Sequence, residues 1–387
     1  MDTRSSMTRI GATTVLAAVM LLSPACKKES QDKPAGDTTG TSTGTATGTP
    51  AAAEKKPAGG KIALLLPESK TARYESHDRP HFERKVKELC GECDVIYSNA
   101  DQDAAKQQNQ AEAALTNGAQ VLVLDPVDSA SAAAIVARAR QSKIPVISYD
   151  RLITGAEVDY YISFDNEKVG KLQATALVDK LKADGKGSGT IVMINGSPTD
   201  NNARLFKNGA HSVIDGSGLK IGQEYDTPDW SPDKAQQQME QAITAIGKGK
   251  IAGVYCANDG TAGGAIAAMK AAGVKPLPPV TGQDAELAGI QRILAGEQFM
   301  TVYKAIKPEA ETAAELAVAL MRGQPAPAGK LNAKVNNGKV DVPSILLEPV
   351  AVTKDNVKST VVADGFWKAE EICTGNYKDA CTAAQIQ

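Results

Sequence analysis

Short runs of aliphatic side chains alternate with longer segments of helical apolar spacing from residue 61 onward. The short runs predict strands, and the longer segments predict helices. The predicted strands are 61–66, 93–98, 120–125, 144–148, 158–163, 190–195, 219–226, 251–256, 279–282, 298–303 and 345–352. The predicted helices include 103–117, 129–142, 167–183, 202–215, 234–247, 261–272 and 307–322. This alternation is typical of α/β folds with mainly parallel sheets flanked by helices, and so many strands favour two lobes over one sheet.

Polar clusters stand immediately after several of these strands. The first strand is followed by Lys70, Arg73 and Tyr74, and the fourth by Asp150 and Arg151. Later strands are followed by clusters that contain Asp200, Asn202, Trp230, Asn258, Asp284 and Lys304. Open α/β sheets bind ligands beyond the carboxyl ends of their strands. Because the clusters are rich in Asp, Asn, Lys and Arg and poor in nucleophiles, they predict a hydrogen-bonding site with no catalytic residues.

Longer motifs contain many of these residues: YDR at 149–151, SFDNEKVG at 163–170, GSPTDNNAR at 196–204, NDGTAGGAI at 258–266, GQDAELAGIQRI at 282–293 and TVYK at 301–304. Together and in this order, they resemble the bacterial periplasmic sugar-binding proteins of ABC importers, in particular the D-xylose-binding and multiple-sugar-binding members. The resemblance covers about residues 61–366. It implies the type I periplasmic-binding-protein fold, in which two α/β lobes are joined by a three-strand hinge.

The resemblance implies that the chain crosses between the lobes three times, near 163–165, 303–305 and 340–344. Lobe one would then consist of 61–163 and 305–342, and lobe two of 164–304 and 343–366. The C-terminal tail, 367–387, falls outside the resemblance.

The resemblance also assigns the polar clusters to a sugar site. Carboxylates, amides and guanidinium groups bind closely spaced hydroxyl groups, and an aromatic side chain covers the apolar face of a sugar ring. The implied ligands are Lys70, Arg73, Tyr74, Asp150, Arg151, Asp200, Asn202, Trp230, Asn258, Asp284 and Lys304. We therefore expect a monomeric, non-enzymatic receptor without a cofactor, which closes around D-xylose or a similar aldose and delivers it to the permease of an ABC importer. The alternative is a receptor for another sugar or a sugar-like signalling molecule, which a chemoreceptor or sensor reads.

Several of these residues have a second interpretation. Asp200 and Asn202 can cap the following helix, and Trp230 can be an ordinary packed aromatic residue. Tyr74 stands where the xylose binders have Trp, so it either stacks on the sugar or packs against lobe one. Asp259 is expected to cap the helix at Thr261 and not to contact the ligand.

The first 25 residues have the pattern of a secretory signal peptide, with Arg4 and Arg9 before an apolar stretch and small residues before Cys26. Cys26 resembles the lipidated first residue of a lipoprotein; the alternative is cleavage nearby, which leaves it as a spare thiol. Residues 26–60 lack the apolar side chains of a folded segment and predict a disordered tether. The sequence therefore predicts an exported protein, periplasmic or on the cell surface, anchored to a membrane through Cys26.

The remaining cysteines also favour an oxidising compartment. Their short spacings predict two local disulfides, Cys90 with Cys93 and Cys373 with Cys381. Cys256 lies in an apolar strand and is expected to be a buried free thiol. The first pair can also be read as a redox motif, but it lies at a helix end, whereas a catalytic CxxC opens a helix.

Charge and motifs exclude several other classes. The chain has 45 acidic and 43 basic side chains, so it lacks the basic excess of a nucleic-acid binder. No helix-turn-helix precedes residue 61, as a repressor of the same fold would require. His77 and His81 have the spacing of a metal pair, but Pro80 intervenes and no third ligand is evident, so no metal is predicted. An exported hydrolase is the remaining rival, because two suitably separated carboxylates suffice for glycoside hydrolysis.

Overall fold

The computed structural model describes residues 59–386. The predicted signal peptide, Cys26 and all but the last two residues of the predicted tether lie outside the described residues. Within this described range, no helix is long and apolar enough to cross a membrane.

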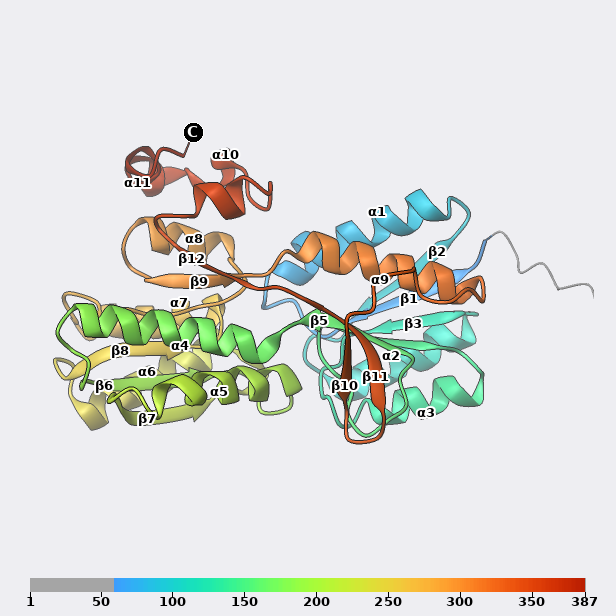
Figure 1. Cartoon of the computed structure of the whole chain (residues 1–387), viewed down its shortest axis with the longest axis horizontal. Helices are drawn as coiled ribbons and strands as arrows, with labels where there is room; N and C mark the ends of the chain where they lie inside the picture. Colours follow the sequence, from blue (N-terminus) through green and yellow to red (C-terminus); the bar gives the residue numbers. More distant parts are fainter. Residues whose placement is uncertain (1–58, 387) are drawn as a thin grey trace, which may run out of the picture. The chain divides into compact units, whose positions relative to one another are not determined.

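Strands and helices alternate along the described chain (Figure 1). The strands are β1 (Lys61–Leu66), β2 (Asp94–Asn99), β3 (Val121–Leu124), β4 (Val146–Tyr149), β5 (Tyr160–Phe164), β6 (Thr190–Asn195), β7 (Lys220–Asp226), β8 (Ile251–Cys256), β9 (Met300–Tyr303), β10 (Ala333–Asn336), β11 (Asp341–Leu347) and β12 (Val350–Thr353). The α-helices are α1 (Arg79–Leu89), α2 (Ala104–Thr116), α3 (Ala133–Gln141), α4 (Asn166–Ala183), α5 (Asn201–Ile214), α6 (Pro232–Ile246), α7 (Asp259–Ala271), α8 (Leu287–Leu294), α9 (Ile306–Met321), α10 (Ala369–Ile372) and α11 (Lys378–Ala383). Short helical turns are η1 (Tyr74–Asp78), η2 (Pro228–Trp230), η3 (Lys358–Val362) and η4 (Gly375–Tyr377).

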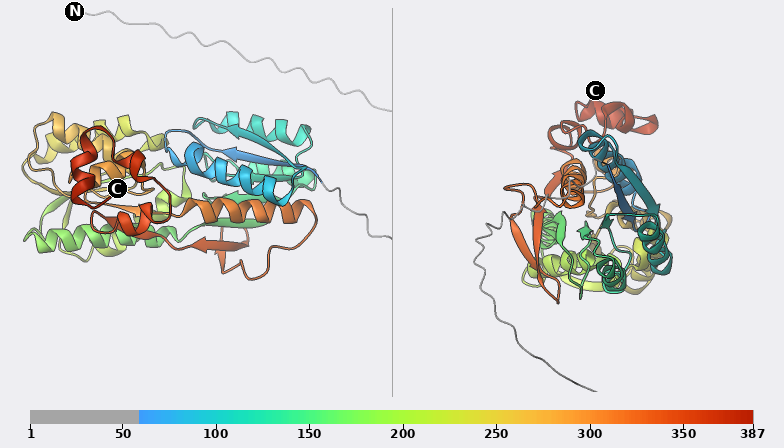
Figure 2. Two further views of the ribbon diagram at one scale, coloured as in Figure 1. Left: turned by 90° about the horizontal axis from the view of Figure 1, so that it is seen from above. Right: turned by 90° about the vertical axis from the view of Figure 1, so that its right-hand side faces the viewer.

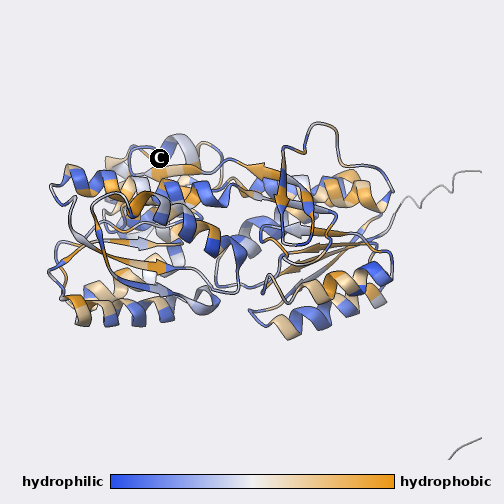
Figure 3. Ribbon diagram, turned by 60° about the horizontal axis from the view of Figure 1, so that its bottom comes forward, coloured by the Kyte–Doolittle hydropathy of each residue, from blue (hydrophilic) through white to orange (hydrophobic). Residues whose placement is uncertain are grey.

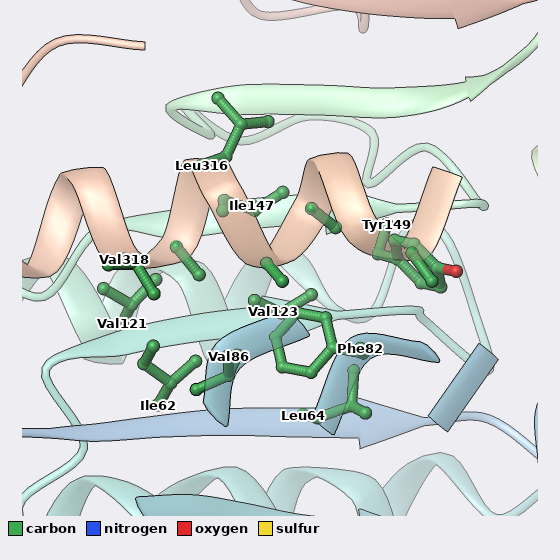
Figure 4. Close-up of a cluster of buried hydrophobic side chains, with 14 of the residues drawn as sticks. Ile62, Leu64, Phe82, Val86, Val121, Val123, Ile147, Tyr149, Leu316 and Val318 are labelled. Carbon is green, nitrogen blue, oxygen red and sulfur yellow. The ribbon is translucent and has the colours of Figure 1, made fainter. Parts of the chain in front are cut away.

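Lobe one is built on a seven-stranded sheet with the order β10-β11-β5-β4-β3-β1-β2. All its strand pairs are parallel except β10 with β11. Because side chains alternate between the faces of a strand, Ile62 and Leu64 pack toward α1 and α9, while Ala63 and Leu65 pack toward α2 and α3. Figure 4 shows the first of these layers, with Phe82 of α1 lying over the strands. Because both faces of the sheet are buried, the strands are held in place, and so are the polar loops that follow their carboxyl ends.

Lobe two repeats this arrangement with different strands. The parallel sheet β7-β6-β8 continues through a parallel bridge between Val254 and Val280. The N–H of Phe299 donates to the carbonyl oxygen of Val280 at 2.9 Å, which connects the antiparallel pair β9-β12. Helices α4 and α5 cover one face, and α6 and α7 cover the other. In Figure 3 the strands are mainly hydrophobic and the helices carry both colours, as expected of helices with one buried face.

The chain crosses between the lobes three times, after β5, between β9 and α9, and between β11 and β12. The third crossing lies later than the predicted 340–344. Strand β11 pairs with β5 in the lobe-one sheet as far as Leu347, and the chain then leaves through Glu348 and Pro349. Since proline has no N–H for a strand ladder, the apolar run predicted as one strand, 345–352, is divided at this point.

Two further differences concern short elements. The predicted strand 279–282 forms only the single bridge at Val280. Strand β10 lies in a polar segment and was not predicted; its antiparallel pairing with β11 forms the edge of the lobe-one sheet.

The C-terminal extension, defined here as residues 366–386, is drawn in red in Figure 2. It packs on lobe two through contacts between α10 and α8. Cys373 is bonded to Cys381 within this extension, and Cys90 to Cys93 after α1. These are the pairs expected from the sequence. Cys256 is a buried free thiol.

Candidate functional site

A pocket lies where the carboxyl ends of strands from both lobes meet. Its walls consist of Thr71, Arg73, Tyr74, Asp150, Arg151, Asp200, Asn202, Phe206, Trp230, Asn258, Gln283, Asp284 and Lys304. The segments after β1 and β4 supply the lobe-one residues, and segments after β6, β7, β8 and β9 supply most of the lobe-two residues. The space enclosed between these side chains is small, about 20 Å³.

Ten of the eleven predicted ligand residues line this pocket. Lys70 does not: its side chain is exposed, and only its backbone N–H points inward, to the carboxylate of Glu68. Thr71, Phe206 and Gln283 were missed. The last two had a signal in the sequence, because Gln283 precedes a predicted ligand and Phe206 follows another by one helical turn.

Arg73 is held by three carboxylates of lobe one. Its Nε and Nη2 donate to Oδ2 and Oδ1 of Asp78 at 2.9 and 2.6 Å. Nη2 also donates to Oε2 of Glu309 at 2.9 Å, and Nη1 to Oδ1 of Asp150 at 3.2 Å. Burial raises the pKa of Glu309 well above its ordinary value, although Arg73 opposes the shift. The guanidinium plane is therefore fixed by bonds within its own lobe.

Arg151 forms a second centre and reaches across to lobe two. Its Nε lies 3.0 Å from Oδ2 of Asp200, which belongs to lobe two, and 3.6 Å from Oδ1 of Asp125, which belongs to lobe one. Its Nη2 lies 3.8 Å from Oε1 of Glu68. Burial raises the pKa of Asp125 and of Asp200, against the attraction of Arg151. Arg151 is thus the counter-charge of a buried acidic region.

Asp150 connects the two arginine centres. Its Oδ1 accepts from Arg73, and its Oδ2 accepts from the hydroxyl group of Tyr74 at 3.0 Å. Nη2 of Arg151 donates to the same hydroxyl oxygen at 3.2 Å. Burial would raise the pKa of Asp150, but the charges of Arg73, Lys304 and Arg151 outweigh burial and lower it to about 2. Asp150 is therefore ionised, and Tyr74 is part of the hydrogen-bonding network.

Lobe two faces this network with an ion pair and amides. Nζ of Lys304 lies 3.0 Å from Oδ1 of Asp284 and 3.8 Å from Oδ1 of Asp150. Nε2 of Gln283 donates to Oδ2 of Asp284 at 3.1 Å. Lys304 directly follows β9, at the second crossing between the lobes. Its ammonium group therefore lies between carboxylates of the two lobes.

The helix-capping interpretation is correct for Asp200 and not for Asn202, which lies inside α5, and Asn258 is a cap that was not predicted. Oδ1 of Asn258 accepts from the N–H of Thr261 at 2.9 Å and caps α7. Oδ1 of Asp200 accepts from the N–H of Asn202 at 2.8 Å and caps α5. The caps hold these side chains at helix starts that point into the pocket.

An apolar wall lies beside the polar groups. The rings of Trp230 and Phe206 meet edge to face, with centroids 6.3 Å apart. Nε1 of Trp230 donates to Oδ2 of Asp200 at 3.1 Å. A Cβ atom at Gly196 would lie 2.0 Å from the Trp230 ring, so glycine is required there for the indole to reach its position.

Three pocket residues other than glycine adopt left-handed backbone conformations. Their φ angles are +51° at Asp150, +52° at Trp230 and +88° at Asp284. Such conformations cost about 1–3 kcal/mol each and persist where the surroundings determine them. The strain aims these side chains into the pocket from the ends of regular elements.

The lobes are in contact across the pocket. Nδ2 of Asn202 in lobe two donates to the backbone oxygen of Asp150 in lobe one at 2.9 Å. The N–H of Ser129 donates to the backbone oxygen of Thr199 at 3.0 Å, and the N–H of Asn201 donates to Oγ of Ser129 at 3.1 Å. The structure therefore shows the closed arrangement.

The expected capping role of Asp259 is wrong. The cap of α7 is Asn258, and Asp259 is buried deeper, where it accepts from the side chains of Gln298 and Thr301 and from the N–H of Glu286. Burial raises the pKa of Asp259 to about 7. Within residues 59–386, no group of three or more His, Cys, Asp or Glu side chains is arranged to hold a metal ion.

Comparisons with known proteins agree with this geometry. Residues 62–325 match the family described as Periplasmic binding protein domain. The chain is 42% identical over 316 residues to the D-xylose-binding periplasmic protein of Escherichia coli strain K12. The aligned region covers 81% of this chain and 92% of that protein. It is 36% identical over 340 residues to the multiple sugar-binding periplasmic receptor ChvE of Rhizobium radiobacter, which covers 84% of this chain and 94% of that protein.

Two solved structures extend the likeness to three dimensions. An ABC transporter solute binding protein from Clostridium phytofermentans, with bound β-D-glucose, matches with a TM-score of 0.75 and 31% identity over 81% of this chain and 99% of its own. A carbohydrate transporter solute binding protein from Chloroflexus aurantiacus, in complex with D-glucose, matches with a TM-score of 0.73 and 32% identity over 80% of this chain and 97% of its own.

Proposed function

Because the chain belongs to the periplasmic binding protein family, we propose that it is an exported receptor that captures a monosaccharide between its lobes for an ABC importer. D-xylose or a similar aldose is the proposed ligand, because one relative is named for D-xylose binding and another for binding multiple sugars. The observation that carries the proposal is the pocket, in which two fixed guanidinium groups, several carboxylates and amides surround an aromatic wall.

The pocket chemistry supports a single sugar ring. Its wall residues converge from both lobes on one small space, which suits a monosaccharide better than a longer saccharide. The polar network offers both donors and acceptors to closely spaced hydroxyl groups. The indole of Trp230 is the proposed cover for the C–H face of the ring.

The charge balance favours neutral sugars over sugar acids and sugar phosphates. The cations of the network are Arg73, Arg151 and Lys304, and its carboxylates are Glu68, Asp78, Asp125, Asp150, Asp200, Asp284 and Glu309. Each guanidinium group already has carboxylate partners. A ligand carboxylate or phosphate would therefore enter a region in which carboxylates outnumber cations, even when Asp125, Asp200 and Glu309, whose pKa values burial raises, are counted as neutral.

Transport follows from closure and not from a chemical step. The sugar stabilises the closed arrangement because it contacts both lobes, and the closed form is what the permease would receive. We propose no catalytic residue and no cofactor for this protein. The proposal includes a monomeric receptor, anchored to a membrane through Cys26.

Thermal-shift and calorimetric titration of the purified protein against D-xylose, D-glucose, L-arabinose, D-glucuronate and D-xylose phosphate would test the proposal. A ligand that binds only the folded state raises the melting temperature. We expect at least one neutral aldose to bind and both anionic compounds to bind at least tenfold more weakly. Release of free sugar from pentosides, or no binding of any aldose, would contradict the proposal.

A further inference from the structure

The C-terminal extension of lobe two contacts lobe one outside the pocket. The imidazole ring of His77, in η1 of lobe one, stacks on the ring of Phe366, with centroids 3.9 Å apart and planes 12° apart. Trp367 meets the same imidazole edge-on, at 4.7 Å and 75°. His77 is 7% exposed, and its Nε2 has no hydrogen-bond partner among the described residues. The imidazole is therefore packed as an apolar ring against aromatic side chains of the other lobe.

Both sides of this contact adjoin the pocket network. His77 directly precedes Asp78, the bidentate partner of a pocket arginine. Nε1 of Trp367 donates to the backbone oxygen of Ala285 at 2.8 Å, and Ala285 follows a pocket carboxylate in the chain. A change in this contact would thus be felt by pocket residues on both lobes.

The aromatic pair is attached firmly to lobe two. Phe366 lies in a buried cluster with Ile372 and Cys381 of the extension and with residues of α8 and β12. Nε2 of Gln291 in α8 donates to the backbone oxygen of Ile372 at 3.0 Å. The disulfide between Cys373 and Cys381 closes the extension on itself. The pair therefore moves with lobe two when the lobes open.

We propose that Phe366 and Trp367 form a latch that holds His77 when the lobes close, and that this latch increases the affinity of the pocket for its sugar. The inference rests on the proposed function, because it concerns closure of the same pocket. Opening would separate the imidazole from the aromatic pair, so the ring contacts are gained only on closing. Contacts of this kind correspond to roughly three- to tenfold in affinity.

The latch holds a neutral imidazole and therefore weakens in acid. Burial lowers the pKa of His77 to about 4; His81 and Arg73 act in the same direction, while Asp78 and Glu371 oppose it. An imidazole exposed by opening would have an ordinary pKa near 6.5. Protonation then favours opening, so the latch contributes fully above pH 6.5 and loses its contribution as the pH falls from 6.5 toward 4.

A double-mutant cycle on the dissociation constant tests the latch. At pH 7.5, calorimetry on the full chain should show that His77→Ala and Trp367→Ala each weaken sugar binding roughly three- to tenfold. The affinity of the double variant should be no lower than that of the single variant with the lower affinity. Multiplicative losses in the double variant would overturn the latch. Trp367→Phe keeps a ring but loses the bond to Ala285, so it should retain most of the affinity; a loss equal to that of Trp367→Ala would also overturn it.

The pH dependence has its own matched variants. His77→Phe keeps a ring that cannot titrate, so its ratio of affinities at pH 7.5 and 5.0 should be severalfold smaller than that of the wild type. His211→Gln removes a histidine of lobe two that is paired with Asp215 and Glu224, and it should keep the wild-type ratio. An unchanged ratio in His77→Phe would overturn the pH dependence of the latch.

Closure can also be followed without a ligand. Spin labels on cysteines introduced at the exposed positions Arg138 of lobe one and Lys248 of lobe two report the distance between the lobes. The latch predicts a larger share of short distances in the sugar-free wild type than in Trp367→Ala, and equal shares would overturn it. If the wild type bound no sugar, the proposed function would fail, and this measurement would still test the latch.

Discussion

The two lobes build their halves of the pocket in different ways. In lobe one, Arg73 and Asp150 belong to a network of buried ion pairs, most of which lie within the lobe. In lobe two, Trp230 and Phe206 form an apolar wall, and Asn258 is fixed mainly by capping a helix. Loss of a charge from lobe one removes bonds to several buried partners at once, whereas loss of an apolar or amide group from lobe two mainly removes a contact. We therefore expect lobe one to orient the sugar and contribute most of the affinity.

The largest expected effect comes from removing the junction of the lobe-one network. Asp150→Ala removes a carboxylate that Arg73, Tyr74 and Lys304 share, and each lost bond between buried polar or charged groups costs about 1–3 kcal/mol. We expect sugar affinity to fall by a few hundredfold in calorimetry, since about 1.4 kcal/mol is tenfold. Asp101→Asn, which removes an exposed carboxylate paired with Lys106, is the control and should bind normally. A loss below threefold in Asp150→Ala would show that lobe one does not dominate.

A smaller effect is expected from the apolar wall of lobe two. Trp230→Ala should weaken binding by about tenfold, because it removes the proposed stacking surface and one hydrogen bond to Asp200. Trp230→Phe keeps a ring and should lose less. Gly196→Ala should resemble Trp230→Ala, because the added methyl group would occupy the position of the indole. If Trp230→Ala cost more than Asp150→Ala, the comparison between the lobes would be reversed.

The supports of Arg73 give a finer test of the lobe-one network. Asp78 holds the guanidinium group with two hydrogen bonds, and Glu309 holds it with one. Because burial raises the pKa of Glu309 well above its ordinary value, Glu309→Gln resembles the protonated acid and should change affinity by less than about threefold. Asp78→Asn should cost roughly three- to tenfold. Equal losses would mean that Glu309 acts as a full charge.

The last expected effect concerns stability in acid and not affinity. The pKa of Asp150 is lowered to about 2 in the folded protein, below the ordinary value near 3.9. Its ionised form therefore stabilises the fold above about pH 4, and this contribution is lost as the pH falls toward 2. The difference in urea midpoint between the wild type and Asp150→Asn should shrink over this range. A constant difference from pH 5 to 2 would contradict the lowered pKa.

Much of the pocket could be predicted because its polar clusters follow strands and the family resemblance implied which of their residues are ligands. The direction in which each side chain of a loop points could not be predicted. Lys70 and Thr71 both follow β1, but Glu68 accepts the backbone N–H groups of both, and this turn leaves Lys70 exposed and Thr71 in the wall. Nothing in the local sequence distinguishes the two.

The buried carboxylates behind the pocket were also beyond prediction. Glu309 stands in an amphipathic segment where a glutamate is ordinarily exposed, and its burial depends on Arg73, which lies far away in the sequence. The third crossing was misplaced for a similar reason. Residues 345–352 are mainly apolar; Pro349 marks where the strand is divided, but only the pairing of β11 with β5 shows that the part before it belongs to lobe one.

The pairing of β11 with β5 also has a consequence for how the chain folds. Ser344 lies beside Tyr161, so the lobe-one sheet joins segments separated by the whole central part of lobe two. Closing so long a loop is slow compared with forming local contacts. We expect the central part of lobe two to fold early. The backbone N–H and C=O groups along one edge of β5 stay unpaired until β11 forms its strand pairing with β5. A chain truncated before β10 would leave this edge open to pairing with other chains, so intact C-terminal sequence should matter for solubility as well as for binding.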